Sequence, residues 1–209
     1  MSGVAPSPAV AVIGGGVIGL AIAWRLAAGG ARVELFERGE LAGEATHVAA
    51  GMLAPVSEAD PAEPALLALG LESARAWPGF AAELKAAAAH RAPLIRTDGT
   101  LLVARDADES RWLEREAQLR TAQGLECERL TPTQARRLEP DLAPGLRGAL
   151  HVPGDLSVDP REVAFTLAAA ARASGAQLHE HAAVESLDDP RLRPFDRVVV
   201  SSGAWPVRV

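Results

Sequence analysis

The sequence predicts an α/β fold built around a Rossmann-like βαβ unit, and three consecutive segments near the N-terminus carry this prediction. Residues 9–13 (AVAVI) form a short apolar run that ends at glycines, which is typical of a strand buried on both faces of a parallel sheet. Residues 17–28 have the broad apolar face of a helix, and Gly29-Gly30 supplies its stop. Residues 32–37 (RVELFE) alternate polar and apolar side chains, as a second strand would, and end in an acid. Together these segments predict one right-handed β-α-β crossover.

The rest of the chain predicts further helices and strands. Two strand segments, 94–97 and 100–104, flank Asp98-Gly99, a dipeptide typical of hairpin turns. Residues 64–90 are predicted as a long helix that is interrupted near Pro78-Gly79. The remaining predictions are a loop at 41–55 leading into a short helix, helices at 108–123, 131–138 (capped by Thr131) and 161–174, an irregular stretch at 140–153, strands at 176–181 and 196–201, and a strand-like segment at 181–187.

Composition excludes several classes of protein. The 209 residues carry a formal net charge of −6, which disfavours non-specific binding to nucleic acid or to anionic membranes. A single cysteine, Cys127, excludes an internal disulfide framework and a thiolate cluster for a metal, and favours a cytoplasmic location. The first 24 residues are uncharged, but Pro6, Pro8 and the glycine triplet at 14–16 would break a membrane-spanning helix, so no membrane segment is expected.

A glycine-rich motif, Gly14-Gly15-Gly16-Val17-Ile18-Gly19, lies between the first predicted strand and helix. It has the G-x-G-x-x-G spacing of a dinucleotide-binding turn. Gly14 permits a tight turn, Gly16 lets the backbone approach a diphosphate, and Gly19 lets the helix pack close to the strand. The helix N-terminus then favours the negative charge of the phosphates.

Glu37 stands at the end of the second predicted strand, about 20 residues after the glycines, where an acid accepts hydrogen bonds from ribose hydroxyls. Its charge would repel a 2′-phosphate, which disfavours NADP. These residues alone leave both NAD and FAD open.

The residues after the second strand distinguish the two. The run GGGVIGLAIAWRLAAGGARVELFERG, with Ala45-Thr46 and the segment 49–55 (AAGMLAP), resembles the D-amino-acid oxidase family of FAD-dependent flavoproteins, and is most similar to its glycine-oxidising members of thiamine biosynthesis. Supporting segments lie at 97–101, 138–140, 148–160 and 201–205. The resemblance covers nearly the whole chain and is most specific in the first 55 residues.

The resemblance implies a cofactor site. Val17 and Ile18 would lie over the diphosphate turn, Glu37 with Arg38 would hold the adenosine ribose, and Val184 would bracket the adenine. The implied contacts to FAD are Gly14, Gly15, Gly16, Val17, Ile18, Gly19, Glu37, Arg38, Ala45 and Thr46 (the phosphates), Ala49, Ala50, Gly51 and Met52 (the isoalloxazine side), Val184, Ser202 and Gly203.

The family also implies a domain plan and a reaction. Residues 1–90 and 151–209 would form the FAD-binding domain, and residues 91–150 part of an inserted α+β substrate domain. The expected reaction is oxidative deamination of glycine or a similar small amine with O2. Such flavoproteins run well beyond 209 residues, and their substrate-binding arginine lies in the C-terminal half. The sequence therefore predicts a C-terminal truncation, and exposed apolar surface that favours a homo-oligomer.

Two other functions remain open, an NAD-dependent dehydrogenase and a non-catalytic nucleotide-binding remnant. No side chain is predicted as a catalytic acid, base or nucleophile. His179 and His181 would share a strand face, but no third metal ligand is placed by spacing, so no metal site is predicted. His47 is a candidate for a phosphate contact, and a surface histidine is an equally good interpretation.

Overall fold

The computed structural model describes residues 7–88 and 95–208, which form two compact units. The first unit comprises Met1–Ala50, Gly79–Pro93 and Asp159–Val209, and the second comprises Gly51–Pro78 and Leu94–Val158. The chain thus leaves the first unit and returns to it. The boundaries of an FAD-binding domain (1–90 and 151–209) and a substrate domain (91–150) are functional assignments and stay a prediction.

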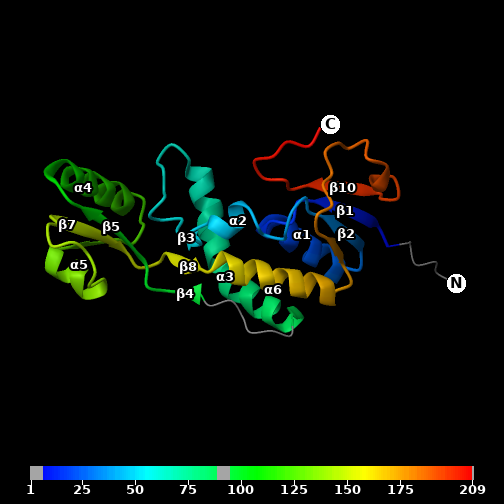
Figure 1. The fold of residues 1–209 in the computed structure, drawn as a ribbon. Coiled ribbons are helices and arrows are strands. Elements are labelled where there is room, and N and C mark those ends of the chain that lie inside the picture. The colour runs from blue at the N-terminus through cyan, green and yellow to red at the C-terminus, as the bar shows by residue number, and fades with distance from the viewer. Residues whose placement is uncertain (1–6, 89–94, 209) are drawn as a thin grey trace. The chain divides into compact units, whose positions relative to one another are not determined.

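The first unit is built on a four-stranded parallel sheet with the order β10-β1-β2-β9 (Figure 1). Its strands are β1 (Ala9–Ile13), β2 (Arg32–Phe36), β9 (Gln177–His179) and β10 (Arg197–Val200). All five residues of β1 are buried, which is why its sequence is continuously apolar instead of alternating. These strands and the helix between β1 and β2 confirm the predicted α/β fold class.

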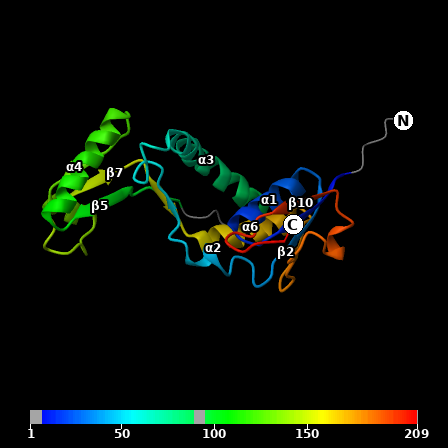
Figure 2. The ribbon, with the colours of Figure 1, turned by 90° about the horizontal axis from the view of Figure 1, so that it is seen from above.

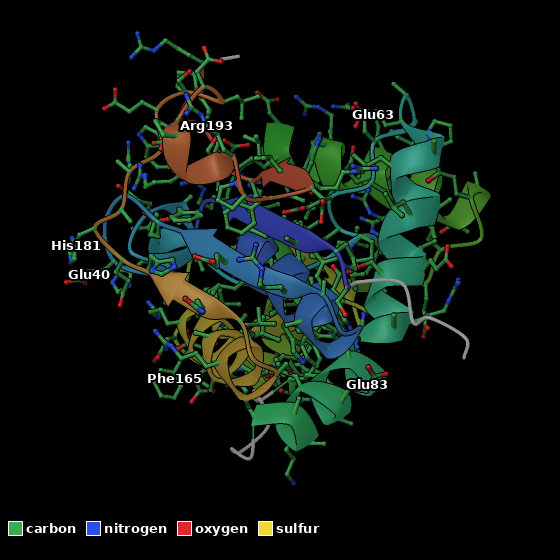
Figure 3. All side chains as sticks on the ribbon, turned by 90° about the vertical axis from the view of Figure 1, so that its right-hand side faces the viewer. Glu40, Glu63, Glu83, Phe165, His181 and Arg193 are labelled. Atoms are coloured by element: carbon green, nitrogen blue, oxygen red, sulfur yellow. The ribbon has the colours of Figure 1, made fainter. Side chains whose placement is uncertain are left out.

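Helices cover one face of this sheet and irregular chain covers the other. Helix α1 (Val17–Ala28) packs along α6 (Pro160–Ala173), and both contact the strands. On the other face, Ala11, Ile13 and Phe36 pack against Val184 and Leu192 in one core cluster. Figure 3 shows the strands lying between the segment that carries Arg193 and the helix that carries Phe165. The short 3-10 helix Pro190–Leu192 lies within the covering segment.

The second unit contains two small antiparallel sheets. One has the order β5-β7-β6, with β5 (Thr100–Ala104), β6 (Glu128–Leu130) and β7 (Gly148–Val152), and the other has the order β3-β8-β4, with β3 (Met52–Leu53), β4 (Ile95–Arg96) and β8 (Leu156–Val158). Helix α4 (Ala107–Ala122) packs on β5 and β7, as Figure 2 shows, and α5 (Pro132–Leu138) packs on β6 and β7. This mixture agrees with the predicted α+β insertion.

Several local predictions were wrong. The expected hairpin around Asp98-Gly99 does not form, because β4 pairs with β8 and β5 pairs with β7. The stretch 140–153, predicted to be irregular, contains β7, which is the central strand of its sheet. Residues 181–187 form no strand, since they cover the sheet instead of extending it.

The long helix α3 (Pro64–Ala88) runs through Pro78 without the predicted interruption. Pro78 is exposed, so solvent can satisfy the carbonyl that the proline leaves without a partner. The predicted ends at His90 and Leu94 fall outside the described residues. No helix in the described part of the chain has the length and hydropathy needed to cross a membrane.

Candidate dinucleotide site

The turn after β1 and the start of the following helix require glycine at two positions, Gly14 and Gly19. Gly14 has φ +105°, and a Cβ there would lie 2.5 Å from the carbonyl oxygen of Ser201. A Cβ at Gly19 would lie 1.9 Å from the carbonyl oxygen of Gly14, so any side chain would push α1 away from β1. The turn is therefore a bare backbone surface, the kind that admits a diphosphate.

The N-terminus of α1 meets the four-residue helix α2 (Ala45–Val48). Gly16 is the N-cap and provides no side chain to the helix. Instead, the buried hydroxyl of Thr46 accepts the N–H of Val17 at 3.0 Å. The hydroxyl hydrogen of Thr46 stays free to donate in turn, and Ile18 beside it is 64% exposed. This end of α1 is thus open to an anionic ligand, whose charge the helix dipole favours.

The carboxylate of Glu37 is fixed beside this turn. It is 8% exposed, and its Oε2 accepts the N–H of Gly15 at 2.7 Å while its Oε1 accepts the N–H of Gly39 at 2.9 Å. Each carboxylate oxygen can accept a second hydrogen bond. Two backbone amides thus hold the acid in one orientation, with capacity left for two hydroxyl groups.

These parts open into a cavity of about 760 Å³ within the first unit. It lies at the carboxyl ends of β1 and β10, where the chain order of the sheet reverses, and ligands of open α/β sheets bind at this point. Twelve of the predicted residues line it: Gly14, Gly16, Val17, Ile18, Glu37, Arg38, Ala45, Thr46, Ala49, Val184, Ser202 and Gly203. The volume and the donor set fit a dinucleotide.

Comparison with known proteins identifies which dinucleotide. The family model of FAD dependent oxidoreductases matches residues 9–209, nearly the whole chain. The chain belongs to this family. FAD, the cofactor expected from the sequence, is confirmed as the cofactor of the family.

Named relatives of this FAD-dependent oxidoreductase agree. Glycine oxidase of Geobacillus kaustophilus is 35% identical over 96% of the chain and 55% of its own length. A Rhizobium etli protein, provisionally named a thiamine biosynthesis oxidoreductase, is 35% identical over 93% of the chain and 54% of its own length. The crystal structure of the Geobacillus kaustophilus glycine oxidase superposes with a TM-score of 0.86 at 33% identity, covering 97% of this chain and 57% of that one. The chain spans about half the length of the curated relatives it matches.

The other five predicted cofactor residues lie elsewhere. Gly15, Gly19 and Ala50 do not line the cavity. A Cβ at Gly15 would meet Leu41 and Glu37, and a Cβ at Gly19 would meet Gly14, so these two glycines allow close packing around the turn. Gly51 and Met52 belong to the second unit, where Met52 pairs with Ser157. The roles of all seventeen predicted residues toward FAD stay predictions.

Several residues that line the cavity of this FAD-dependent oxidoreductase were not predicted from the sequence, above all Glu44, Glu185, Trp205 and Arg208. Trp205 lies in a segment used only to support the family resemblance. The others carry no local signal, because they reach the cavity from the loop after β2 and from irregular chain on the sheet.

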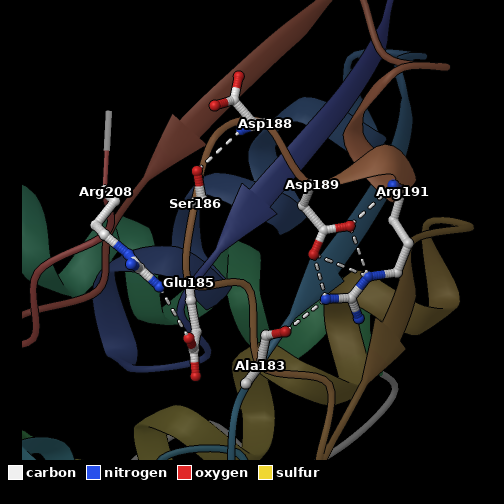
Figure 4. Close-up of polar contacts among 7 residues, drawn as sticks. All are labelled: Ala183, Glu185, Ser186, Asp188, Asp189, Arg191 and Arg208. Atoms are coloured by element: carbon white, nitrogen blue, oxygen red, sulfur yellow. Dashed lines mark hydrogen bonds and ion pairs between the residues drawn. The ribbon is translucent and has the colours of Figure 1, made fainter.

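A network of hydrogen bonds holds the irregular chain that carries Val184 and Glu185 (Figure 4). The carboxylate of Asp189 binds the guanidinium of Arg191, which also donates to the carbonyl oxygen of Ala183. The hydrogen bonds from the side chain and the backbone of Arg191 lower the pKa of Asp189 from 3.8 to about 2. An ion pair within this segment thus stabilises the irregular chain whose residues Ala183, Val184 and Glu185 line the cavity.

The other candidates do not form sites. His179 ends β9, stacks on Phe36 and meets Glu34 at 3.0 Å, whereas His181 lies beyond the strand with φ +53°, so the two do not share a strand face. Among the residues described, no group of three or more His, Cys, Asp or Glu could hold a metal ion. His47 is not among the residues that line the cavity, and Cys127 packs at the edge of a core cluster in the second unit.

Proposed function

We propose that this protein is an FAD-dependent oxidase that deaminates glycine or a similar small amine. The observation that carries the proposal is the fixed carboxylate of Glu37 beside a glycine turn that opens into a cavity of about 760 Å³. Similarity to glycine oxidases, at up to 35% identity, supports the substrate class.

In the proposed reaction an amino acid, O2 and water give an oxo acid, ammonia and hydrogen peroxide, and glycine gives glyoxylate. FAD, when bound, supplies the two-electron chemistry that links amine oxidation to the reduction of oxygen. The residues described bind and orient the cofactor, and we assign no catalytic acid, base or nucleophile among them.

Different groups of the chain would bind different parts of the cofactor. The first-turn amides of α1 and the hydroxyl of Thr46 would donate to the diphosphate, and Glu37 would accept from the ribose hydroxyls. Val184 would bracket the adenine, since its side chain is buried in the core and the residue lines the cavity. Ala49 to Met52 would lead toward the isoalloxazine.

The proposal extends to the setting of the enzyme. A role in thiamine biosynthesis is supported by the name of the Rhizobium etli relative. A cytoplasmic location is supported by the single cysteine. Self-association into a homo-oligomer remains part of the proposal.

Competitive binding of FAD and NAD tests the proposal. Purified protein should retain a yellow flavin, bind added FAD in a fluorescence titration, and bind NAD at least about tenfold more weakly. A colourless preparation that prefers NAD would instead support a nicotinamide-dependent dehydrogenase. FAD binding without oxygen uptake or peroxide formation, with glycine or sarcosine as substrate, would leave a non-catalytic nucleotide-binding protein.

A further inference from the structure

Arg38 and Trp205 face each other at the cavity. The Arg38 guanidinium carbon lies 4.1 Å from the centre of the Trp205 ring, and Arg38 Nη2 lies 2.7 Å from Glu44 Oε1. All three residues line the cavity. The guanidinium is thus held by a ring face on one side and a carboxylate on the other, and both are favourable contacts for a cation.

Trp205 lies at the end of a turn that two hydrogen bonds between Ser202 and Trp205 stabilise. The hydroxyl of Ser202 donates to the carbonyl oxygen of Trp205 at 2.6 Å, and the N–H of Trp205 donates to the carbonyl oxygen of Ser202 at 3.2 Å. Gly203, with φ +64°, makes this turn, and a Cβ there would lie 3.6 Å from the Trp205 ring. The main chain that carries the indole is therefore held in one turn.

The pair joins two loops on opposite sides of the phosphate-binding turn. Arg38 follows β2 and Trp205 follows β10, and these two strands flank β1 in the sheet. Gly14 follows β1, so a contact between the outer loops passes over the turn that begins at Gly14.

We propose that Arg38 and Trp205 form a latch across the mouth of the dinucleotide cavity. The latch opens for FAD to enter and closes again over the bound cofactor. This inference rests on the proposed FAD site and adds to it a control of the rates of binding and release. The side chains of Arg38 and Glu44 are 42% and 49% exposed, so solvent can replace their contacts and opening is fast compared with unfolding.

Rates of FAD binding test the latch, because a barrier at the mouth slows entry and exit together. We would measure association and dissociation by stopped-flow flavin fluorescence for the unchanged protein, Arg38→Met and Trp205→Leu. Arg38→Met removes the charge and keeps an unbranched side chain. Both rate constants should rise by at least about threefold in each variant, and the rise in the association rate constant is the result that distinguishes a latch from a contact to the cofactor.

A matched control exists in the same unit. Arg25 also stacks on a tryptophan, Trp24, at 4.3 Å and pairs with a glutamate, Glu83, at 2.6 Å, but none of the three lines the cavity. Arg25→Met should leave both FAD rate constants unchanged. Glu44→Gln, which weakens the hold on Arg38 without touching the ring, should give an intermediate increase of both.

The possible outcomes distinguish failure of the latch proposal from failure of the proposed FAD site. A rise in the dissociation rate alone, with unchanged association, would mean that Arg38 and Trp205 are ordinary contacts to the cofactor and would overturn the latch. Unchanged rates in both variants would also overturn it. If the unchanged protein binds NAD and not FAD, the proposed function fails, and the same rates measured with NAD decide the latch. Binding of neither dinucleotide overturns both.

Discussion

Asp155 and Arg120 bind the main-chain groups of the same two residues, Val56 and Ser57, with opposite charges. The Asp155 carboxylate accepts the N–H groups of Val56 and Ser57, each at 3.2 Å. The Arg120 guanidinium donates to their carbonyl oxygens, at 2.9 Å for Val56 and 2.6 Å for Ser57. Asp155 is 0% exposed and Arg120 is 2% exposed. Every main-chain polar group of this dipeptide is therefore satisfied by a buried charge.

Arg120→Met should destabilise the second unit by about 3 kcal/mol, because it leaves two buried carbonyl groups without a donor and the Glu116 carboxylate without its cation. Urea unfolding followed by circular dichroism measures the change. Arg111→Met, which breaks the exposed pair with Asp108 on the same helix, should cost less than about 0.5 kcal/mol. Equal losses in the two variants would contradict the role assigned to Arg120.

Gly19→Ala should destabilise the first unit by at least about 2 kcal/mol and abolish FAD binding. The added Cβ would overlap the carbonyl oxygen of Gly14, and neither backbone can move without separating α1 from β1. Gly79→Ala is the matched control in a helix, since nothing lies within 4 Å of a Cβ there, and it should stabilise the protein by about 0.5–1 kcal/mol. Thermal unfolding and flavin titration give both quantities, and a Gly19→Ala variant with normal FAD affinity would refute the close-packing argument.

Glu37→Gln should weaken FAD binding by about 1–3 kcal/mol. The amide keeps one acceptor oxygen, so the N–H of either Gly15 or Gly39 loses its partner and one ribose hydroxyl loses its acceptor. Flavin fluorescence titration measures the change. Glu34→Gln, which alters an acid of the same strand that pairs with His179, is the control and should leave the affinity unchanged. An unaltered dissociation constant for Glu37→Gln would remove the acid from the cofactor site.

The ion pair of Asp189 and Arg191 predicts a stability change in acid. Because the folded protein lowers the pKa of Asp189 to about 2, the ionised carboxylate stabilises the fold above its ordinary value of 3.8, and this contribution is lost as the pH falls from 3.8 to about 2. Asp189→Asn should therefore be less stable than the unchanged protein near neutral pH, and the difference should shrink below the ordinary pKa. Unfolding midpoints across this pH range measure it.

Asp188→Asn is the control for this titration, because Figure 4 shows the Asp188 carboxylate pointing away from Arg191. The variant should follow the unchanged protein across the whole acid range. A stability difference for Asp189→Asn that stays constant with pH would show that the stabilisation by Asp189 does not come from its charge.

Signals contained in a few neighbouring residues were interpreted correctly. The predicted cap Thr131 begins α5, α6 begins within one residue of its predicted start at 161, and the apolar run of β1 leads directly into the glycine turn. Each of these depends on local hydrogen bonds or on backbone conformations that the residue itself favours. Strand pairing has no such local determinant. Asp98-Gly99 is typical of a hairpin turn, yet β4 and β5 each pair with a strand far along the chain, as in the pairs of Ile95 with Val158 and Ala104 with Gly148.

The sequence by itself determined the βαβ unit, the glycine turn and the acid at the end of β2, because these depend on side-chain size, periodicity and spacing along one stretch of chain. Only the tertiary structure decided which side chains complete the site. Trp205 reaches Arg38, and Arg120 and Asp155 reach one dipeptide, because the sheet order and the packing within each unit bring distant segments together. Such contacts depend on the three-dimensional path of the whole chain, and no short window of residues contains that path.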